Sequence, residues 1–309
     1  MSAFETWWQR RSIWPAVPVA GLVERKAGRT VSVVIPALDE AATVAGVVGP
    51  LRDELVPAGL VDEVVVVDGG STDGTADIAA QAGARVIHLP DLCHGVQPRG
   101  KGGALWWAQQ VAEGDLLVFL DADVVPSRAQ TAVALLTPLL LDDGVRFVKA
   151  AFDRPLTVDG VLHRGSGGRV TEMLARPLLN AWWPDLAGFV QPLAGELAAT
   201  RELLADLPFA TGYALEIAML VDVLRLAGIE AMAQADIGER QHRHQSDEAL
   251  GRMSAEVLAA ALDRHAGGPH AEELRQFRRD GHGFAMTSSE VRVGFLPPVA
   301  SLVTPATAG

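Results

Sequence analysis

Short apolar runs alternate with amphipathic stretches along the first part of the chain. Four runs rich in β-branched residues read as strands buried on both faces, at 31–36, 61–68, 84–89 and 115–125. Helical patterns lie between them, at 39–51, 75–84 and 101–110. Asp39 is expected to cap the first helix, and Gly83 to end the second. Such alternation predicts parallel βαβ units, hence a doubly wound α/β sheet that binds ligands at the carboxyl ends of its strands.

The second half of the chain has a less regular pattern. It predicts helices at 170–180, 213–226 and 247–266, and a strand at 231–238. Gly228 follows the second of these helices and is expected to end it. The residues after the last helix are rich in Gly, His and Pro, and we expect them to form a mobile tail.

Composition narrows the class of protein. Of 309 residues, 49% are apolar, which is enough for a sizeable core and argues against disorder. The net charge of −12 argues against binding to nucleic acid or to an anionic membrane, since both need a basic face. Cys93 is the single cysteine, so no disulfide framework forms within the chain. No apolar run reaches the roughly 20 residues of a membrane span. These features favour a cytoplasmic protein.

Two carboxylates follow the strand at 115–125. Asp121 and Asp123 flank Ala122, and in a strand residues i and i+2 point to the same side. Both carboxylates can therefore face the edge of the sheet where ligands bind. Hard oxygen ligands suit Mg²⁺ or Mn²⁺ bound across a diphosphate. A solvated turn after a strand explains the pair D-x-D equally well when it is considered alone.

Two other polar residues lie at expected ligand positions. Asp68 ends the second strand and begins D-G-G-S-T-D-G-T, where it is able to accept a hydrogen bond from the imide of a nucleobase. A plain turn also accounts for these glycines. Lys101 opens a helix, whose N-terminus attracts phosphate, although an ordinary surface lysine is the simpler alternative. The glycine spacings match neither a P-loop nor the Rossmann dinucleotide fingerprint, which disfavours nucleotide hydrolysis and dehydrogenation.

These segments together resemble a known family. Pro36-Ala37-Leu38-Asp39-Glu40, Asp68-Gly69-Gly70-Ser71, Lys101 within G-K-G and Asp121-Ala122-Asp123 look like the nucleotide-sugar half of GT-A glycosyltransferases. Later segments are similar to glucosyl-3-phosphoglycerate synthases, namely Gly168 to Glu172, Gln191 to Leu193 with Gly195-Glu196, Thr211 to Ile217 and His242-Arg243. The resemblance covers nearly the whole chain in order, and the set is specific although no single segment is.

The resemblance implies a fold and a division of the chain. The fold is GT-A, a Rossmann-like, mainly parallel sheet flanked by helices. Residues 1–29 would be an N-terminal arm, 30–125 the nucleotide-sugar half, 126–246 the acceptor half and 247–309 a C-terminal helix with the tail. The implied activity is retaining transfer of a sugar, with Mg²⁺ or Mn²⁺ as cofactor, and we expect a homodimer.

The resemblance also implies roles for individual residues. The donor nucleotide would be lined by Pro36, Ala37, Leu38, Glu40, Asp68, Gly69, Asp121 and Ala122, with Lys101 near the sugar and phosphates. Asp123 and His242 would hold the cation. Glu216 would lie beneath the donor sugar, and with Asp123 and Lys101 it would form the catalytic set. The acceptor's acid groups would meet Gly168, Arg169, Val170, Thr171, Arg243 and His244.

Some of these residues also have a simpler structural explanation, and others depart from the usual pattern of the family. Glu216 lies on an amphipathic helix, where a glutamate usually faces water. His242 lies in the basic run R-Q-H-R-H, which also suits a solvated strand end. His244 stands where the family usually has Asn, and Gly69 where it commonly has Ser. Because His244 falls where the acceptor should be recognised, the acceptor is less certain than the fold.

Several functions fit the sequence. The leading hypothesis is transfer of glucose from UDP-, GDP- or ADP-glucose to the 2-hydroxyl of 3-phosphoglycerate. An antibiotic-pathway enzyme using a GDP-sugar and a carboxylated thiol such as ergothioneine, as in lincosamide assembly, would keep the fold and metal site. A noncatalytic nucleotide-sugar sensor is a third reading. A sugar-phosphate nucleotidyltransferase would need a Gly-rich, Arg-containing loop after the first strand, which P-A-L-D-E does not offer.

Overall fold

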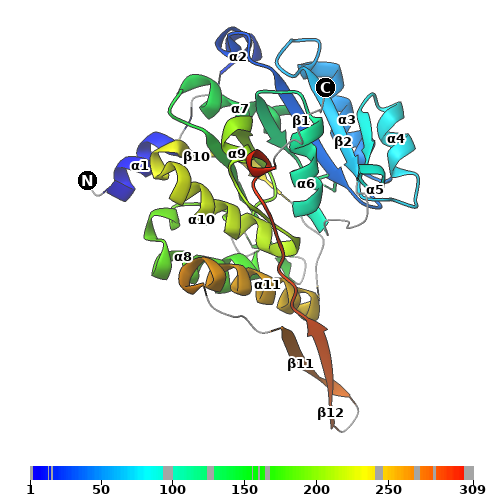
Figure 1. Ribbon diagram of the computed structural model, residues 1–309, viewed down its shortest axis with the longest axis vertical. Coiled ribbons are helices and arrows are strands. Elements are labelled where there is room, and N and C mark those ends of the chain that lie inside the picture. Colours follow the sequence, from blue (N-terminus) through cyan, green and yellow to red (C-terminus); the bar gives the residue numbers. More distant parts are fainter. Residues whose placement is uncertain are drawn as a thin grey trace, which may run out of the picture.

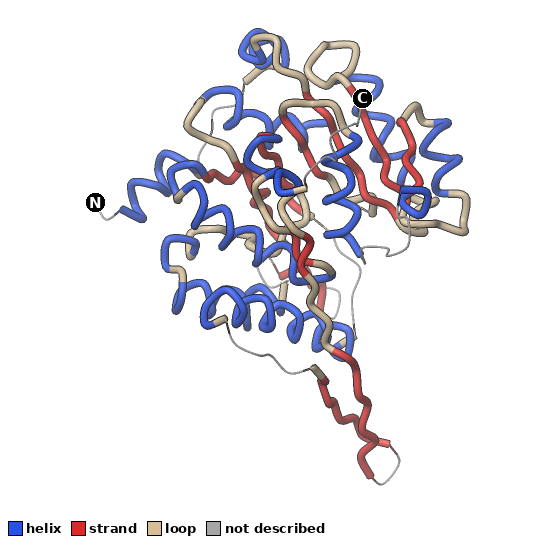
Figure 2. Tube along the Cα trace, in the orientation of Figure 1, coloured by secondary structure: helices blue, strands red, loops and turns tan. Residues whose placement is uncertain are grey.

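A seven-stranded sheet forms the centre of the protein (Figures 1 and 2). The computed structural model describes residues 3–12, 14, 17–92, 100–123, 129–154, 156–158, 161–163, 168–240, 246–267, 272–280 and 283–302. The strand order is β10-β5-β8-β4-β1-β2-β3. The bounds are β1 Val31–Ala37, β2 Glu63–Asp68, β3 Arg85–His88, β4 Leu116–Phe119, β5 Phe147–Asp153, β8 Leu197–Thr200 and β10 Met232–Glu239. Only β8 runs antiparallel to its neighbours within this sheet. The predicted mainly parallel α/β sheet is confirmed.

Helices cover both faces of the sheet (Figure 1). On one face lie α2 Val19–Lys26, α3 Val44–Pro50, α4 Thr75–Gln81 and α7 Ala129–Leu141. The other face carries α1 Ala3–Arg11, α6 Gly100–Val111, α8 Arg176–Trp182, α9 Arg201–Ala205, α10 Leu215–Ala227 and α11 Asp247–Ala266. Side chains alternate between the two cores along each strand, so Val33 faces one and Val34 the other. This alternation explains why the central strands β1 and β4 are apolar at nearly every position.

Short helical segments complete the chain. They are the π-helical turns η1 Leu51–Leu55 and η2 Thr171–Ala175, the 3-10 turns η3 Pro184–Leu186, η4 Gly212–Ala214, η5 Ile229–Ala231 and η6 Val299–Ser301, and the short helix α5 Leu89–Leu92. The segment η4 leads directly into α10, and η2 leads directly into α8. Both junctions bring predicted site residues to the start of a helix.

The first predicted helix begins later than expected. Helix α3 starts at Val44, and its N-cap residue is Thr43 rather than Asp39. Asp39 lies in the preceding loop with a positive φ of 55°. Its Oδ1 accepts a hydrogen bond from the backbone N–H of Thr72 at 2.9 Å. The prediction of a cap at Asp39 is therefore wrong, because this side chain joins the loops after β1 and β2 instead.

Several elements had no counterpart in the sequence prediction. These include α7, β5 and β8, whose apolar residues fill both cores. We expected a mobile tail after α11, whereas the structure has an antiparallel hairpin there, β11 Glu273–Asp280 and β12 Gly283–Glu290. Figure 1 shows this hairpin extending away from the sheet. A second hairpin pairs β6 Leu156–Val158 with β7 Val161–His163, and β13 Phe295–Leu296 pairs with β9 Phe209–Ala210.

The N-terminal arm packs against the sheet. Trp7 of α1 is buried, and its indole N–H donates to the carbonyl of Met232 at 2.9 Å. Its ring lies 5.1 Å from that of Phe189. Arg11 forms an ion pair with Asp142, which follows α7. The arm thus contributes to the core on the face of the sheet that carries α10. No helix among the described residues is long and apolar enough to cross a membrane.

A glycine allows α6 to approach β9 closely. A Cβ on Gly102 would overlap the carbonyl oxygen of Ala210 and lie 3.3 Å from the Cα of Thr211. Because both obstacles are backbone atoms, we expect Gly102→Ala to lower the free energy of unfolding by about 2 kcal/mol. Gly46→Ala, in α3 with no atom within 4 Å, should raise it by up to about 1 kcal/mol. Denaturant unfolding of both variants tests this, and equal midpoints would contradict the packing described here.

Candidate functional site

The carboxyl ends of β1, β2 and β4 meet at one edge of the sheet. Ala37 pairs with Asp68 in the β1–β2 register, and Val34 pairs with Phe119 in the β1–β4 register. The predicted donor residues all follow these strand ends or form them, namely Pro36, Ala37, Leu38, Glu40, Asp68, Gly69, Asp121, Ala122 and Asp123. The fold therefore brings three distant segments of the sequence together, as the parallel topology requires.

Asp68 is held rigidly at this edge. Its side chain is 1% exposed, and one oxygen accepts hydrogen bonds from the backbone N–H groups of Gly70 and Ser71, each at 3.2 Å. His88 Nδ1 lies 3.2 Å from the same oxygen. The side chain of Leu38 is 59% exposed on the neighbouring loop. A fixed carboxylate beside an exposed apolar side chain offers a polar and an apolar contact to a planar base.

Lys101, Asp121 and Glu216 come from different elements and form one cluster. Lys101 is the second residue of α6, and its Nζ is ion-paired with Asp121, which follows β4. The same Nζ lies 4.0 Å from Oε1 of Glu216, the second residue of α10. Glu216 therefore faces the cluster and not open solvent, which excludes the simpler reading of this residue.

Gly195 leaves the space that this cluster occupies. A Cβ at this position would overlap the Nζ of Lys101 and lie 2.7 Å from Oδ1 of Asp121. Both obstacles are ends of side chains, unlike the backbone atoms that surround Gly102. Any side chain at position 195 must therefore separate Lys101 from Asp121.

Burial and charge oppose each other in the cluster. Burial raises the pKa of Glu216, while Lys101 and Lys149 favour its ionised form. For Lys101, burial favours the neutral amine, but Asp121, Glu216 and Glu196 outweigh it and raise the pKa above the ordinary value. Lys101 is thus a permanent cation near neutral pH. Ionisable groups whose pKa values are shifted by burial and by charged neighbours are typical of active sites.

Sequence analysis missed a layer of buried charges beside these residues. Glu196 is 3% exposed, and its Oε1 lies 3.2 Å from the guanidinium of Arg240. Arg240 also donates to the hydroxyl of Thr131 at 2.6 Å. Lys149 of β5 is fully buried. The available signal was a charged residue inside an apolar run, as in F-V-K-A-A-F, because such a residue is rarely buried without a reason.

Helix α11 fixes the turn that precedes Glu216. The carboxylate of Glu256 accepts a hydrogen bond from the backbone N–H of Tyr213 at 2.8 Å. Gly212, with φ of +64°, lies directly against this carboxylate, since a Cβ there would overlap Oε2 of Glu256. Both contacts involve the carboxylate of Glu256, so α11 holds the turn before α10 through this one side chain. This contact sets the position from which Glu216 reaches Lys101.

Part of the predicted acceptor set is present at the start of η2. Gly168 has φ of +81°, and Val170 and Thr171 are buried. Arg169 is 44% exposed through its side chain and forms an ion pair with Asp247 in the first turn of α11. Three other predicted site residues, His242, Arg243 and His244, lie outside the described residues.

Asp123 is exposed just after β4, next to the cluster of Lys101 and Asp121. Its carboxylate and that of Asp121 are hard oxygen donors at one strand end, which is the donor chemistry that Mg²⁺ and Mn²⁺ prefer. Within the described ranges no three His, Cys, Asp or Glu side chains are grouped tightly enough to hold a metal ion. The other predicted ligand, His242, lies outside those ranges. The residues present fit a cation bound between protein and diphosphate.

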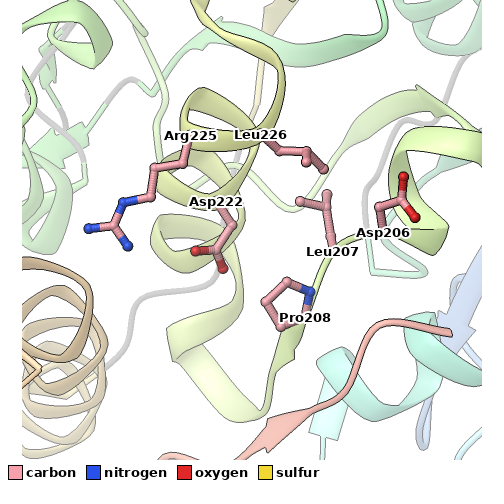
Figure 3. Close-up of a pocket in the computed structure, with 6 residues that line it drawn as sticks. All are labelled: Asp206, Leu207, Pro208, Asp222, Arg225 and Leu226. Carbon is pink, nitrogen blue, oxygen red and sulfur yellow. The ribbon is translucent and has the colours of Figure 1, made fainter. Parts of the chain in front are cut away.

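A pocket of about 280 Å³ lies elsewhere, between the end of α9 and the second half of α10 (Figure 3). It is lined by Asp206, Leu207, Pro208, Asp222, Arg225 and Leu226. One of its two acids, Asp222, is paired with Arg264 at 2.7 Å. None of the predicted site residues lines this pocket, so it is not the donor site.

Comparison with known proteins assigns the family. Residues 32–193 match the family described as glycosyl transferase family 2. The chain belongs to this family. It is 43% identical to the glucosyl-3-phosphoglycerate synthase of Mycolicibacterium smegmatis, over 93% of this chain and 95% of that protein. The glucosyl-3-phosphoglycerate synthase of Mycolicibacterium paratuberculosis is 46% identical, over 90% of this chain and 85% of the relative. The suspected resemblance to these synthases is confirmed.

Solved structures of family members agree with the fold. The glucosyl-3-phosphoglycerate synthase of Mycobacterium tuberculosis in complex with Mn²⁺, UDP-glucose and phosphoglyceric acid gives a TM-score of 0.83 at 39% identity, covering 94% of this chain and 97% of that chain. The mannosyl-3-phosphoglycerate synthase of Rubrobacter xylanophilus gives a TM-score of 0.88 at 38% identity, covering 98% of this chain and 99% of that chain. The expected GT-A fold is confirmed. This family 2 member is a glycosyltransferase, and the reading as a noncatalytic sensor is set aside.

Proposed function

We propose that this glycosyltransferase moves glucose from a nucleotide donor to the 2-hydroxyl of 3-phosphoglycerate, with Mg²⁺ or Mn²⁺ as cofactor. The observation that carries the proposal is similarity over almost the full chain to synthases of that name, one of them solved with Mn²⁺, UDP-glucose and phosphoglyceric acid. UDP-glucose is the first donor to test. The cluster of Lys101, Asp121 and Glu216 lies at the edge of the sheet where this chemistry is expected.

The donor's nucleotide fits the loops after β1 and β2. Asp68 would accept a hydrogen bond from the base, and Leu38 would cover one face of the ring. Lys101, at the N-terminus of α6, would bind the diphosphate, because free N–H groups and an ammonium both attract phosphate. When it binds a phosphate oxygen, Lys101 weakens its pairing with Asp121. This exchange of partners connects donor binding to the rest of the cluster.

The cation would be held by Asp123 together with His242, with Asp121 near the ribose and the metal. When bound across the diphosphate it would neutralise the charge that develops on the departing nucleotide. The residues of this chain would do the remaining work by placing the two substrates. Asp123 is exposed and adjacent to the ion pair of Lys101 and Asp121, so it is available to a ligand entering from solvent.

The acceptor would lie between η2 and α10. Arg169, with backbone groups of Val170 and Thr171, would bind its acid groups, since a guanidinium matches a carboxylate or phosphate. Arg243 and His244 would complete this side. Glu216 would lie beneath the donor sugar and fix its orientation. The resemblance to the family implies that the hydroxyl would attack from the face that the diphosphate leaves, with retention of the anomeric configuration.

The sugar has a second candidate. The similarity to the mannosyl-3-phosphoglycerate synthase spans 98% of this chain with a TM-score of 0.88, so transfer of mannose to the same acceptor is the alternative that a specific observation favours. The two sugars differ in one stereocentre, and the choice between them depends on hydrogen bonds to hydroxyl groups in the donor site. An assay that offers the enzyme both glucose donors and a mannose donor distinguishes the two sugars.

A matrix of donors and acceptors tests the proposal. UDP-glucose, GDP-glucose, ADP-glucose and GDP-mannose are each mixed with 3-phosphoglycerate, with ergothioneine or with no acceptor, in the presence of Mg²⁺ or Mn²⁺. We expect nucleotide release with a glucose donor and 3-phosphoglycerate, and an α-linked product by NMR. Release only with GDP-mannose would move the proposal to its second candidate. No release with 3-phosphoglycerate from any donor would refute both, and release with ergothioneine would favour the antibiotic-pathway hypothesis.

Asp247 competes with the acceptor for Arg169. The pair is solvent-exposed, with Asp247 90% and Arg169 44% exposed, so it contributes little stability and an anionic substrate can displace it. We expect Asp247→Asn to lower the KM for 3-phosphoglycerate by roughly two- to fivefold, with the KM for the donor unchanged. Steady-state kinetics with each substrate varied in turn measure both constants. Glu248→Gln on the same helix turn is the control, and an equal effect in both variants would contradict a specific role of Asp247.

We also propose that the enzyme is a homodimer. The hairpin of β11 and β12 extends from the sheet, and the Met286 side chain on it is 55% exposed. A two-stranded hairpin is only marginally stable in water unless it packs on something else, so a second copy is a suitable partner. Light scattering of the full chain and of Met286→Glu tests this. A monomeric wild type, or a dimer unaffected by the substitution, would count against the hairpin as the contact.

A further inference from the structure

Lys149 is an unusual residue in the core of this enzyme. It lies on β5, between Leu197 of β8 and Gln234 of β10, and its side chain has no solvent exposure. Among the described residues its ammonium has no hydrogen-bond partner. It is two positions after Phe147, so it points to the same face of the sheet, toward the core that contains α10. The ammonium of Lys149 therefore lies on the same side of the sheet as α10, which carries Glu216.

Charged groups from four segments surround this ammonium. Its strongest electrostatic interaction is with Glu216 of α10, followed by Lys101 of α6, Asp121 after β4 and Glu196 before β8. Arg154, which follows β5, interacts with the same three carboxylates. Burial lowers the pKa of Lys149 to about 8, so the ammonium is still mostly protonated at neutral pH. Glu216 in turn has two cationic neighbours, Lys101 and Lys149.

Two other cations of this cluster are engaged elsewhere. Lys101 is paired with Asp121, and in the proposed reaction it also binds the donor diphosphate. Arg240 is paired with Glu196 and bonded to Thr131. A buried carboxylate that loses its cation tends to take up a proton. Lys149 is fully buried and makes no hydrogen bond among the described residues, so it stays beside Glu216 when the donor is bound.

We propose that Lys149 is a positioning residue for sugar transfer, a buried cation that keeps the Glu216 carboxylate ionised and in place while Lys101 engages the donor. The inference rests on the proposed function, since it assumes that Glu216 acts on the donor sugar. It gives a reason for a buried ammonium at a position where an apolar side chain would pack at lower cost. Lys149 itself does not touch the substrates in this arrangement.

The test compares Lys149→Met with the full-length wild type, first in the donor and acceptor matrix. Removing the cation raises the pKa of Glu216, so the acid limb of the kcat profile should move to higher pH by roughly one unit. At a pH below the new midpoint, kcat should fall about tenfold for that one-unit shift, with less change in the KM for either substrate. The thermal unfolding midpoint should equal or exceed that of the wild type, because a desolvated charge has been removed.

A second readout does not depend on activity. The pKa of Lys149 in the folded protein, about 8, is below its ordinary value of 10.5, so between these values the unfolded chain binds more protons than the folded one. The wild type should therefore gain stability as pH rises from about 8 to 10.5, and Lys149→Met should lack this gain. Urea unfolding at several pH values measures the difference. Equal pH dependence in the two proteins would overturn the buried charge on which the proposal depends.

Controls separate positioning from packing. Phe147→Leu alters the same strand and the same core without changing charge, so it should lower the unfolding midpoint and leave the pH profile unshifted. If Lys149→Met does not fold, Lys149→Gln takes its place in every comparison. An unshifted acid limb in a folded variant, or activity lost only in proportion to the folded fraction, would overturn the proposal. Absence of turnover in the wild type would instead refute the proposed function.

Discussion

Asp123→Ala is expected to slow sugar transfer by about a thousandfold, and a chelator should do the same to the wild type. The reason is that Asp123 is an exposed carboxylate at the strand end beside Lys101 and Asp121, where the proposed cation would meet the diphosphate. Loss of this cation leaves the departing nucleotide without compensation for its charge. Nucleotide release measured across a titration of Mn²⁺ tests the expectation, together with Mn²⁺ binding followed by electron paramagnetic resonance.

The control for this substitution is another exposed aspartate. Asp53 lies on η1, among the helices that cover the opposite face from α6 and α10, and Asp53→Ala should leave both turnover and Mn²⁺ binding unchanged. Excess Mn²⁺ should restore the chelated wild type but not Asp123→Ala. Full turnover in Asp123→Ala, or in the chelated wild type, would show that transfer does not need a cation held at this strand end.

Gly195→Ala is expected to lower kcat by about a hundredfold while changing the free energy of unfolding by less than about 1 kcal/mol. The added methyl group would occupy the space of the Lys101 ammonium and press on the carboxylate of Asp121. Both are ends of side chains that can move aside, so the fold is expected to tolerate the change. Lys101, however, would no longer lie between Asp121 and Glu216, and a displacement of that size is enough to impair catalysis.

Two glycine variants make the comparison specific. The methyl group of Gly102→Ala would press on backbone atoms, so this variant should be less stable than the wild type. Its activity per folded molecule should stay close to that of the wild type. The methyl group of Gly46→Ala would meet no neighbouring atom, so this variant should keep its activity and be at least as stable as the wild type. Kinetics and denaturant unfolding on the three proteins therefore separate a steric effect on the site from an effect on the fold. Wild-type kcat in Gly195→Ala would mean that the pairing of Lys101 with Asp121 is not needed for transfer.

The regular parts of the fold were predictable because their signals are local. The strand at 31–36 and the helix at 247–266 carry their patterns within their own residues, and the structure has β1 at Val31–Ala37 and α11 at Asp247–Ala266. The strand β8 carries no such signal. It is four residues long, Leu197–Thr200, and it becomes a strand because β4 and β5 pair with it on either side. The cap assigned to Asp39 failed for a similar reason, since its partner Thr72 lies in another loop.

The candidate site also contains residues with a local sequence signal and residues whose role depends on distant parts of the chain. Asp121 and Lys101 could be singled out because strand ends and helix starts are recognisable in sequence, and the structure joins them in an ion pair. Lys149 could not, because its importance comes from burial next to residues far away in the chain. Glu196 belongs to a segment that carries the family resemblance, but its buried pairing with Arg240 is visible only in the structure. The contact between Glu256 and Tyr213 joins two helices and likewise has no local signature. The sequence thus indicated charged residues at strand ends and helix starts, and the structure was needed to find the buried charges beside them.

The antiparallel strand β8 has a consequence for how the protein is made. Leu116 of β4 pairs with Thr200 of β8. During synthesis β4 therefore lacks this second neighbouring strand until the whole segment between the two strands has been made. During that time an apolar strand presents an unpaired edge, which is the kind of surface that recruits other chains. A fragment that stops after β4 is therefore expected to aggregate. A fragment designed to carry the loops after β1 and β2 on a stable fold would have to extend at least through Thr200.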